Sequence, residues 1–157
     1  LGIHWLDLVQ HVTNSSITEA VGFTANVGGQ PIDIEDSAAA ILKFDNGTLG
    51  TVTSGYYLKR GYHSRIKIWG SEGWLHLEQM KDKPLQWLSH KGSHAGKIQQ
   101  WDHSKQPRGY TPFMRACIEA CANNTIPPIK NAESLRAVKV VYSIYEAART
   151  GTKVSIR

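Results

Sequence analysis

The sequence predicts an α+β fold: an open, mainly antiparallel sheet of about six strands with helices packed on one face. Three observations predict this class. Segments with alternating apolar and polar residues, separated by turn residues, fill the region between about residues 17 and 103. Apolar residues at helical spacing mark residues 4–13 and most of residues 111–151. Strands in a run followed by helices in a run are typical of the α+β class.

The first helix is predicted over residues 4–13, and "TNSS" ends it. The next segment, "ITEAVGFTANVGG", alternates in the manner of a half-buried strand and ends at a glycine pair. We expect one face of this strand to carry its larger apolar side chains, Val21, Phe23, Ala25 and Val27.

Three hairpins are predicted in the middle of the chain. "DSAAAILKF" and "TLGTVTSGYYL" flank "DNGT", where Asn-Gly favours a type I′ turn with positive φ at both central residues. "YHSRIKIWG" and "WLHLEQ" form a second pair across "SEG". "LQWLSHKG" and "KIQQWDH" suggest a third, more exposed pair.

The last third is helical. "TPFMRACIEACAN" predicts an amphipathic helix with Thr111 as N-cap and Pro112 at its first position. A longer helix follows, closed by Gly151, and "TKVSI" forms a short terminal strand. We expect the long helix to bury a stripe of larger apolar residues, Leu135, Val138, Val141, Tyr142 and Tyr145.

Composition excludes several classes of protein. A chain of 157 residues fits one domain, and nothing approaches the roughly 18 consecutive apolar residues of a membrane span. The net charge of +5 would permit an anionic partner, but no nucleic-acid-binding module accompanies it. Two cysteines, Cys117 and Cys121, are expected to be buried small apolar residues in a reducing compartment. We therefore expect a cytoplasmic protein with neither nucleic acid nor membrane as partner.

Common cofactor and metal motifs do not occur in the sequence. There is no G-x-G-x-x-G after a strand, no P-loop and no multi-cysteine or H-E-x-x-H signature. We therefore expect no cofactor-binding residues in this chain and no metal site. A stripe of His4, Asp7 and His11 on the first helix is a weak candidate for a divalent cation.

His4 is better placed for acid–base chemistry. The unperturbed pKa of histidine lies near 6.5, so a modest shift sets it as a base at neutral pH. Asp7, at i+3 on the same helix face, could orient the imidazole or contact a bound substrate. The alternative is that both residues only stabilise the start of a helix.

Helices on one side leave the other face of the predicted sheet uncovered. That face would carry a mixture of polar and aromatic residues, among them Thr51, Thr53, Tyr57, His63, Arg65 and Trp69. Exposed faces bearing Trp and Tyr are more often interfaces than plain surface, so we expect a partner, most simply a second copy of the chain. Carbohydrate binding by Trp87 and Trp101 is a less favoured alternative.

Four segments, in order, resemble one known family: "GIHWLDL", "EDSAAAILKFDNGTLGTV", "IKIWGSEGWLHL" and "SIYEAARTGTKVSI". The chain is similar, over nearly its whole length, to the C-terminal domain of the glucose–fructose oxidoreductase/inositol dehydrogenase/MocA (Gfo/Idh/MocA) family of NAD(P)-dependent oxidoreductases. The resemblance implies a dihydrodipicolinate-reductase-like C-terminal domain over residues 1–157, for substrate binding and oligomerisation through the open sheet face.

The resemblance also implies roles for four residues. By position, His4 matches the family's catalytic histidine, which takes the hydroxyl proton of a secondary alcohol while hydride leaves for the cofactor. Asp7 matches a carboxylate that contacts substrate hydroxyls. Tyr62 resembles a substrate-contacting tyrosine in inositol dehydrogenase-like members, and Arg60 lies beside it in "KRGYH".

The dinucleotide-binding half of the family is missing from this chain. NAD or NADP would be bound mainly by an N-terminal Rossmann domain, and the aspartate of the family motif would fall one residue before Leu1. The first residue is not Met, so we expect a piece of a longer enzyme that acts on the CH–OH group of a sugar, polyol or related alcohol. The fragment alone is expected to be inactive. The alternative is a non-catalytic dimerisation or protein-interaction module.

Overall fold

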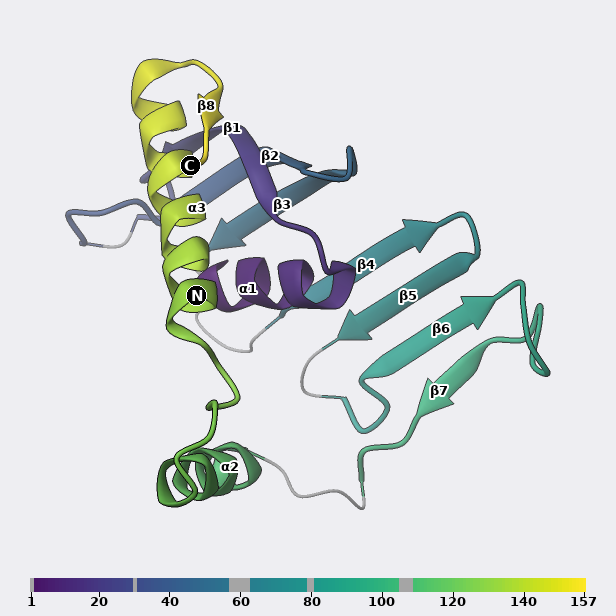
Figure 1. Ribbon diagram of the computed structural model, residues 1–157. Helices are drawn as coiled ribbons and strands as arrows, with labels where there is room; N and C mark the ends of the chain where they lie inside the picture. Colours follow the sequence, from purple (N-terminus) through teal and green to yellow (C-terminus); the bar gives the residue numbers. More distant parts are fainter. Residues whose placement is uncertain (1, 30, 57–62, 79–80, 105–108) are drawn as a thin grey trace. The chain divides into compact units, whose positions relative to one another are not determined.

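The computed structural model describes residues 2–29, 31–56, 63–78, 81–104 and 109–157 (Figure 1). These residues form two compact units. Unit 1 comprises residues 1–59 and 129–157, and unit 2 comprises residues 60–128. Each unit holds one four-stranded antiparallel sheet, with the order β3-β2-β1-β8 in unit 1 and β4-β5-β6-β7 in unit 2.

The elements of unit 1 are α1 (Gly2–Thr13), β1 (Ile17–Ala25), β2 (Ser37–Phe44), β3 (Leu49–Gly55), α3 (Asn131–Thr150) and β8 (Val154–Ser155). The elements of unit 2 are β4 (Arg65–Gly70), β5 (Gly73–Glu78), β6 (Leu85–Ser89), β7 (Gln99–Trp101) and α2 (Thr111–Ala122). The α+β class and the antiparallel pairing predicted from the sequence are confirmed.

The strand count and the single sheet differ from the prediction. Where about six strands in one sheet were expected, the described residues form eight strands in two sheets. The terminal strand β8 adds to the edge of unit 1 by pairing Ser155 with Glu19 of β1. Alternation of apolar and polar residues locates each strand in the sequence. Which strand edges pair depends on contacts between residues far apart in the sequence, and a local pattern does not reveal these contacts.

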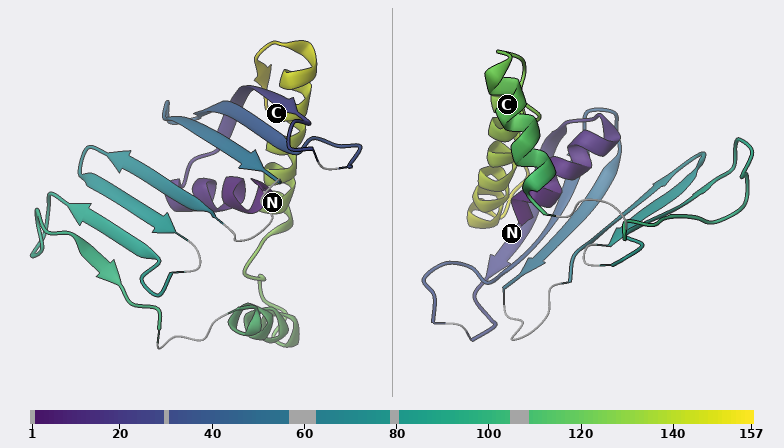
Figure 2. Two further views of the ribbon diagram at one scale, coloured as in Figure 1. Left: turned by 180° about the vertical axis from the view of Figure 1, so that it is seen from behind. Right: turned by 90° about the horizontal axis from the view of Figure 1, so that it is seen from below.

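The hydrophobic core lies in unit 1, between its sheet and two helices. α1 and α3 cover the same face of the sheet (Figures 1 and 2). The core cluster joins residues of both helices and of β1 and β2, namely Leu6, Ile17, Ala20, Ala40, Leu42, Phe44, Val140 and Ile144. The prediction that helices pack on one face of the sheet therefore holds for these two helices.

The buried face of β1 is the opposite of the one predicted. Phe23 and Val27 are each 75% exposed, whereas Ala20 and Gly22 point into the core. An irregularity in the β1–β2 register between Ile17 and Glu19 lets Ile17 and Ala20 both face inward. A Cβ at position 22 would clash with the backbone oxygen of Ala39 and lie 2.6 Å from the Ala40 Cβ. Close strand packing therefore selects glycine, and the larger side chains face outward.

The buried stripe of α3 also differs from the prediction. It consists of Ala137, Val140, Ile144 and Ala147, while Leu135 and Tyr142 are 55% and 69% exposed. Small residues let α3 approach the sheet closely, and the tyrosines need polar surroundings for their hydroxyl groups. The Tyr145 hydroxyl lies 2.5 Å from Glu35 Oε1, and this hydrogen bond raises the pKa of Tyr145 to about 12. Gly151 ends α3 with a φ of 67°, as predicted.

The predicted hairpin between β2 and β3 is present, with a different turn. Only Gly47 has a positive φ, at 85°, whereas a type I′ turn requires it at Asn46 as well. The Gly47 N–H donates to the Phe44 carbonyl, and the Phe44 N–H donates to the Thr48 carbonyl. The loop between Phe44 and Thr48 is thus longer than a two-residue type I′ turn, and Gly47 is its residue in the left-handed conformation.

A buried carboxylate fixes the loop between β1 and β2. Asp36 is 2% exposed and accepts hydrogen bonds from the backbone N–H groups of Val27 and Gly28 and from the Ser37 hydroxyl, at 3.0, 2.5 and 2.8 Å. The hydrogen bond from Val27 is the largest of the effects that hold the pKa of Asp36 below its ordinary value; burial acts in the opposite direction. Asp36 is therefore a structural group rather than a candidate for proton transfer.

Helix α2 departs from two predictions. Its N-cap is Tyr110, and Thr111 is already helical, with the proline at the start of the helix as expected. Cys121 is exposed and Cys117 is half-buried, so the predicted burial of both cysteines is wrong for Cys121. Both cysteines are free thiols.

Candidate functional site

Helix α1 is anchored to the core of unit 1 by two side chains one turn apart. Leu6 is 3% exposed and belongs to the core cluster, and Gln10 is 6% exposed. The Gln10 amide donates to the Leu6 carbonyl at 3.2 Å, and its oxygen accepts the Ile17 N–H at 3.0 Å. The second hydrogen bond joins α1 to the first residue of β1. Together with the buried Leu6, it holds the position and rotation of this helix against the sheet.

That anchoring leaves His4 and Asp7 on the outer side of α1. His4 is exposed and Asp7 is half-buried. Residues at i and i+3 are neighbours on a helix surface, with Cβ atoms about 5–6 Å apart. Among the described residues, neither side chain has a hydrogen-bond or ion-pair partner. The catalytic and substrate-binding roles expected for the two side chains stay predictions.

The start of α1 lies beside the end of β3. A Cβ on Gly2 would lie 3.8 Å from the Cβ and the hydroxyl oxygen of Ser54. Gly2 is therefore near the point where β3 ends, at Gly55. Arg60 and Tyr62, predicted to contact substrate, lie outside the described residues. Their substrate-binding roles remain predictions.

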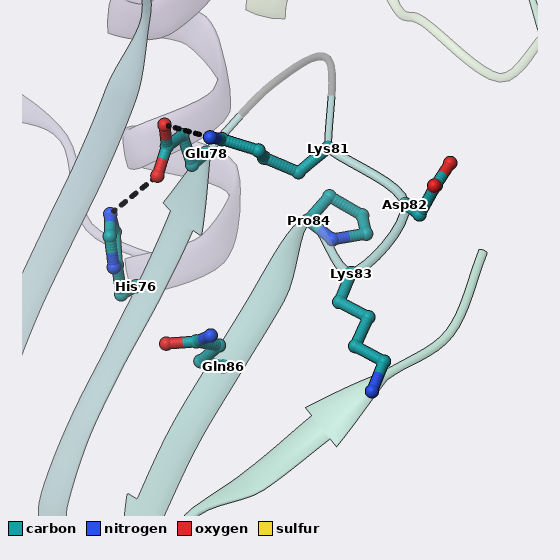
Figure 3. Close-up of a pocket in the computed structure, with 7 residues that line it drawn as sticks. All are labelled: His76, Glu78, Lys81, Asp82, Lys83, Pro84 and Gln86. Carbon is teal, nitrogen blue, oxygen red and sulfur yellow. Dashed lines mark ion pairs between the residues drawn. The ribbon is translucent and has the colours of Figure 1, made fainter. Parts of the chain in front are cut away.

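Unit 2 contains a pocket that the sequence did not reveal. It has a volume of about 300 Å³, and residues of β5, of β6 and of the connection between them line it: His76, Glu78, Lys81, Asp82, Lys83, Pro84 and Gln86 (Figure 3). The only sequence signal is the alternation in "WLHLE", which puts His76 and Glu78 on one face of β5. Such alternation is equally typical of an ordinary solvent-facing strand.

No group of three or more His, Cys, Asp or Glu side chains in the described part of the chain could hold a metal ion, so His4, Asp7 and His11 form no such group. No helix in the described ranges is long and apolar enough to cross a membrane.

The fold is an α+β domain that superposes on part of solved oxidoreductase structures. Residues 1–76 match the model of the GFO/IDH/MocA C-terminal domain. This match confirms, over residues 1–76, the resemblance predicted from the sequence.

Known proteins resemble the chain at low sequence identity. Myo-inositol 2-dehydrogenase of Thermotoga maritima is 18% identical over 145 residues, covering 90% of this chain and 43% of that protein. The crystal structure of an oxidoreductase domain protein from Kribbella flavida superposes with a TM-score of 0.87 at 19% identity, covering 100% of this chain and 49% of that one. Levoglucosan dehydrogenase in complex with NADH has a TM-score of 0.84 at 15% identity, with the same coverage.

These similarities show the fold of the chain and how much of each protein it matches. The chain spans about half the length of the proteins that it resembles. Part of each of these oxidoreductases thus shares the fold of this chain.

Proposed function

We propose that this chain is the substrate-binding and oligomerisation domain of an NAD(P)-dependent oxidoreductase that acts on the CH–OH group of a sugar, polyol or related secondary alcohol. The observation that carries the proposal is the exposed His4, on a helix fixed by Leu6 and Gln10, within the segment that matches the family model. The dehydrogenase names of the relatives, one for myo-inositol and one for levoglucosan, support the substrate class.

In this proposal His4 is the catalytic base. Its imidazole accepts the proton of the substrate hydroxyl group, and no described side chain competes for it. Asp7, one helical turn further, accepts a hydrogen bond from a second hydroxyl and so orients the substrate. Arg60 and Tyr62 are proposed to contact the same substrate, as the family resemblance implies.

The described residues do not fit a nicotinamide dinucleotide. All of their strand pairs are antiparallel, so they contain no strand–helix–strand unit with parallel strands of the kind that binds the pyrophosphate. We therefore assign NAD or NADP to a separate Rossmann domain that would precede this one and derive no step through it here. The NADH in the levoglucosan dehydrogenase structure supports a nicotinamide cofactor. A cytoplasmic location also remains part of the proposal.

We further propose that the open face of the unit 1 sheet binds a second copy of the chain. Phe23, Ile41 and Leu49 on three adjacent strands are 75%, 54% and 70% exposed. Thr51 and Thr53, which pair with Ile41 and Ala39, lie exposed on the same face. An exposed apolar face of this kind supports the proposed interface.

The prediction of a single open face that also carries Arg65 and Trp69 is wrong, because these two residues belong to β4 in the other sheet. Tyr57, expected on the same face, lies outside the described residues.

Light scattering with size-exclusion chromatography tests the self-association. The wild-type chain should elute as a dimer or larger species, and Ile41→Glu should dissociate it. Leu135→Glu, on the exposed side of α3, is the matched control and should leave the assembly intact. A wild-type monomer, or equal dissociation by both variants, would refute an interface at this face.

The alternative function, a non-catalytic dimerisation or protein-interaction module, is favoured by the same exposed face. A substrate screen distinguishes the two. The complete protein is incubated with a panel of sugars and polyols and with NAD or NADP, and the reduced cofactor is followed by absorbance. Reduction that depends on one class of alcohol supports the enzyme, and the 157-residue chain alone should be inactive. Stable assembly without reduction of either cofactor by any alcohol would support the module.

A further inference from the structure

Helix α2 carries both cysteines of the chain on one side of its surface. Cys117 and Cys121 are four residues apart, and residues at this spacing are neighbours on a helix. Both are free thiols; Cys121 is exposed and Cys117 is half-buried. Ala120 is the one residue of α2 that is buried, so the face that carries Cys121 is open to solvent. The two sulfur atoms form a pair of ligands that the function proposed above does not use.

The geometry of the helix opposes a disulfide bond between these two thiols. Neighbours at i and i+4 have Cβ atoms about 5–6 Å apart, whereas a disulfide needs a Cβ separation of about 3.5–4.5 Å. Closing that bond would require the backbone of α2 to distort, and α2 is helical throughout from Thr111 to Ala122. The two sulfur atoms are therefore available as separate ligands.

A metal ion between the two sulfur atoms fits the same spacing. A bond from a thiolate to a first-row metal ion is about 2.3 Å long, so two such bonds in line span about 4.6 Å between the sulfur atoms. The sulfur–sulfur bond of a disulfide spans only about 2.05 Å. The longer bridge matches the wider separation of the two Cβ atoms, so the helix can hold a metal ion without distortion.

The number and kind of ligands select the metal ion. Structural zinc takes four ligands, and the described part of the chain has no group of three His, Cys, Asp or Glu side chains that could hold a metal ion. Glu119 lies between the cysteines in the sequence, but about 200° around the helix from each of them. Thiolates are soft ligands that favour Cu(I), and Cu(I) accepts two of them in a near-linear arrangement. A site with two thiolates and no oxygen ligand therefore suits Cu(I).

The neighbours of the pair on the same helix face are apolar. Met114 and Ile118 are 51% and 63% exposed and offer no oxygen atom to compete for the ligands or the ion. The thioether of Met114 is itself a soft sulfur donor. Met114 is seven residues from Cys121, about 10.5 Å along the helix axis, so an ion held by both cysteines lies beyond its reach. The two cysteines alone form the site.

We propose that Cys117 and Cys121 bind one Cu(I) ion between their two thiolates. Each thiol loses its proton when the ion binds, so two protons are released per ion and no electron is transferred. The site lies within α2 and does not depend on the function proposed for His4. The turnover of a His4 variant therefore has no bearing on this proposal.

Anaerobic competition for Cu(I) between the 157-residue chain and the coloured chelator bicinchoninate tests the proposal. The wild-type chain should take up one Cu(I) per molecule. Cys117→Ser and Cys121→Ser should each weaken binding at least about 100-fold, because loss of a residue that merely supports a ligand already costs about 10–100-fold in metal affinity. Met114→Leu, on the same helix face, is the matched control and should bind Cu(I) as the wild type does.

A double variant separates the spacing of the thiols from their number. Cys121→Ser combined with Ala122→Cys keeps two cysteines on α2, but places the second about 140° around the helix from Cys117. This variant should bind Cu(I) as weakly as the single serine variants. Circular dichroism in the far ultraviolet shows whether each variant keeps its helices.

Four results would overturn the proposal. The first is a wild-type chain that takes no Cu(I) from the chelator. The second is a folded serine variant, or the double variant, that binds as tightly as the wild type. The third is a loss on Met114→Leu as large as that of the serine variants, because the thioether would then be a ligand. The fourth is uptake of one Cu(I) per two chains, because the ion would then join two molecules.

Discussion

Replacing Leu6 by alanine should loosen the helix that presents His4. Leu6 is 3% exposed and packs in the core cluster of unit 1, and the substitution removes three carbon atoms. At about 0.8 kcal/mol per buried methylene-sized group, the transfer term is about 2.5 kcal/mol. The cavity left behind raises the total to about 3–4 kcal/mol, because neighbouring side chains collapse only partly.

Urea unfolding measured at the backbone amide signals of β2 checks this value, since these signals report on unit 1 alone. The matched control is His4→Ala on the same helix, which should change the free energy of unfolding by no more than about 0.5 kcal/mol because the side chain is exposed. A cost below about 1 kcal/mol for Leu6→Ala, or equal costs for the two variants, would refute the idea that Leu6 anchors α1.

Three further predictions concern unit 1. Gln10→Ala should cost about 1–3 kcal/mol in a urea titration, because the buried N–H of Ile17 loses its acceptor; an unchanged midpoint would contradict this. Gly22→Ala should cost about 1–3 kcal/mol, because its Cβ would overlap the adjacent strand, and a stability equal to wild type would show that the strands can separate. Unit 1 should lose stability as the pH falls below about 4, because the native pKa values of Asp36 and Asp45 lie below their ordinary values. The pKa of Asp45 is lowered mainly because its carboxylate accepts a hydrogen bond from the Ser15 hydroxyl. Thermal melting from about pH 7 to 2 checks the sign, and Asp36→Asn should flatten the dependence.

Much of the fold follows from local patterns in the sequence. The sequence predicted a helix over residues 4–13, where the structure has Gly2–Thr13, as well as the hairpin around Asn46 and Gly47 and the end of α3 at Gly151. Spacing, turn residues and a C-cap glycine act within a few residues, so local patterns reveal these features. These features require no knowledge of the partner element.

The errors arise where tertiary packing overrides a local preference. Phe23 and Tyr142 are large and were expected to be buried, but close contacts of β1 and α3 with the rest of unit 1 favour Gly22 and Ala147 inside. The division into two sheets likewise depends on which strand edges meet. The periodicity of apolar residues along the sequence does not show how closely two elements pack or which strands pair.

The candidate site could be predicted only in part. The spacing of His4 and Asp7 indicated a shared helix face, and family resemblance, rather than spacing, assigned their roles. Gln10 was not singled out, since its buried hydrogen bond to Ile17 joins residues of two different elements. The pocket of unit 2 was missed because Lys81 and Asp82 meet His76 only after the β5–β6 hairpin has formed.

The most direct test of the central claim, that this chain supplies the catalytic base of an oxidoreductase, is the turnover of the complete enzyme with His4 replaced by glutamine. On its best sugar or polyol substrate, kcat should fall at least about 100-fold, which is the usual contribution of a general base. His11→Gln, exposed on the same helix, should leave kcat within about threefold of wild type. A His4→Gln enzyme with wild-type kcat would contradict the claim.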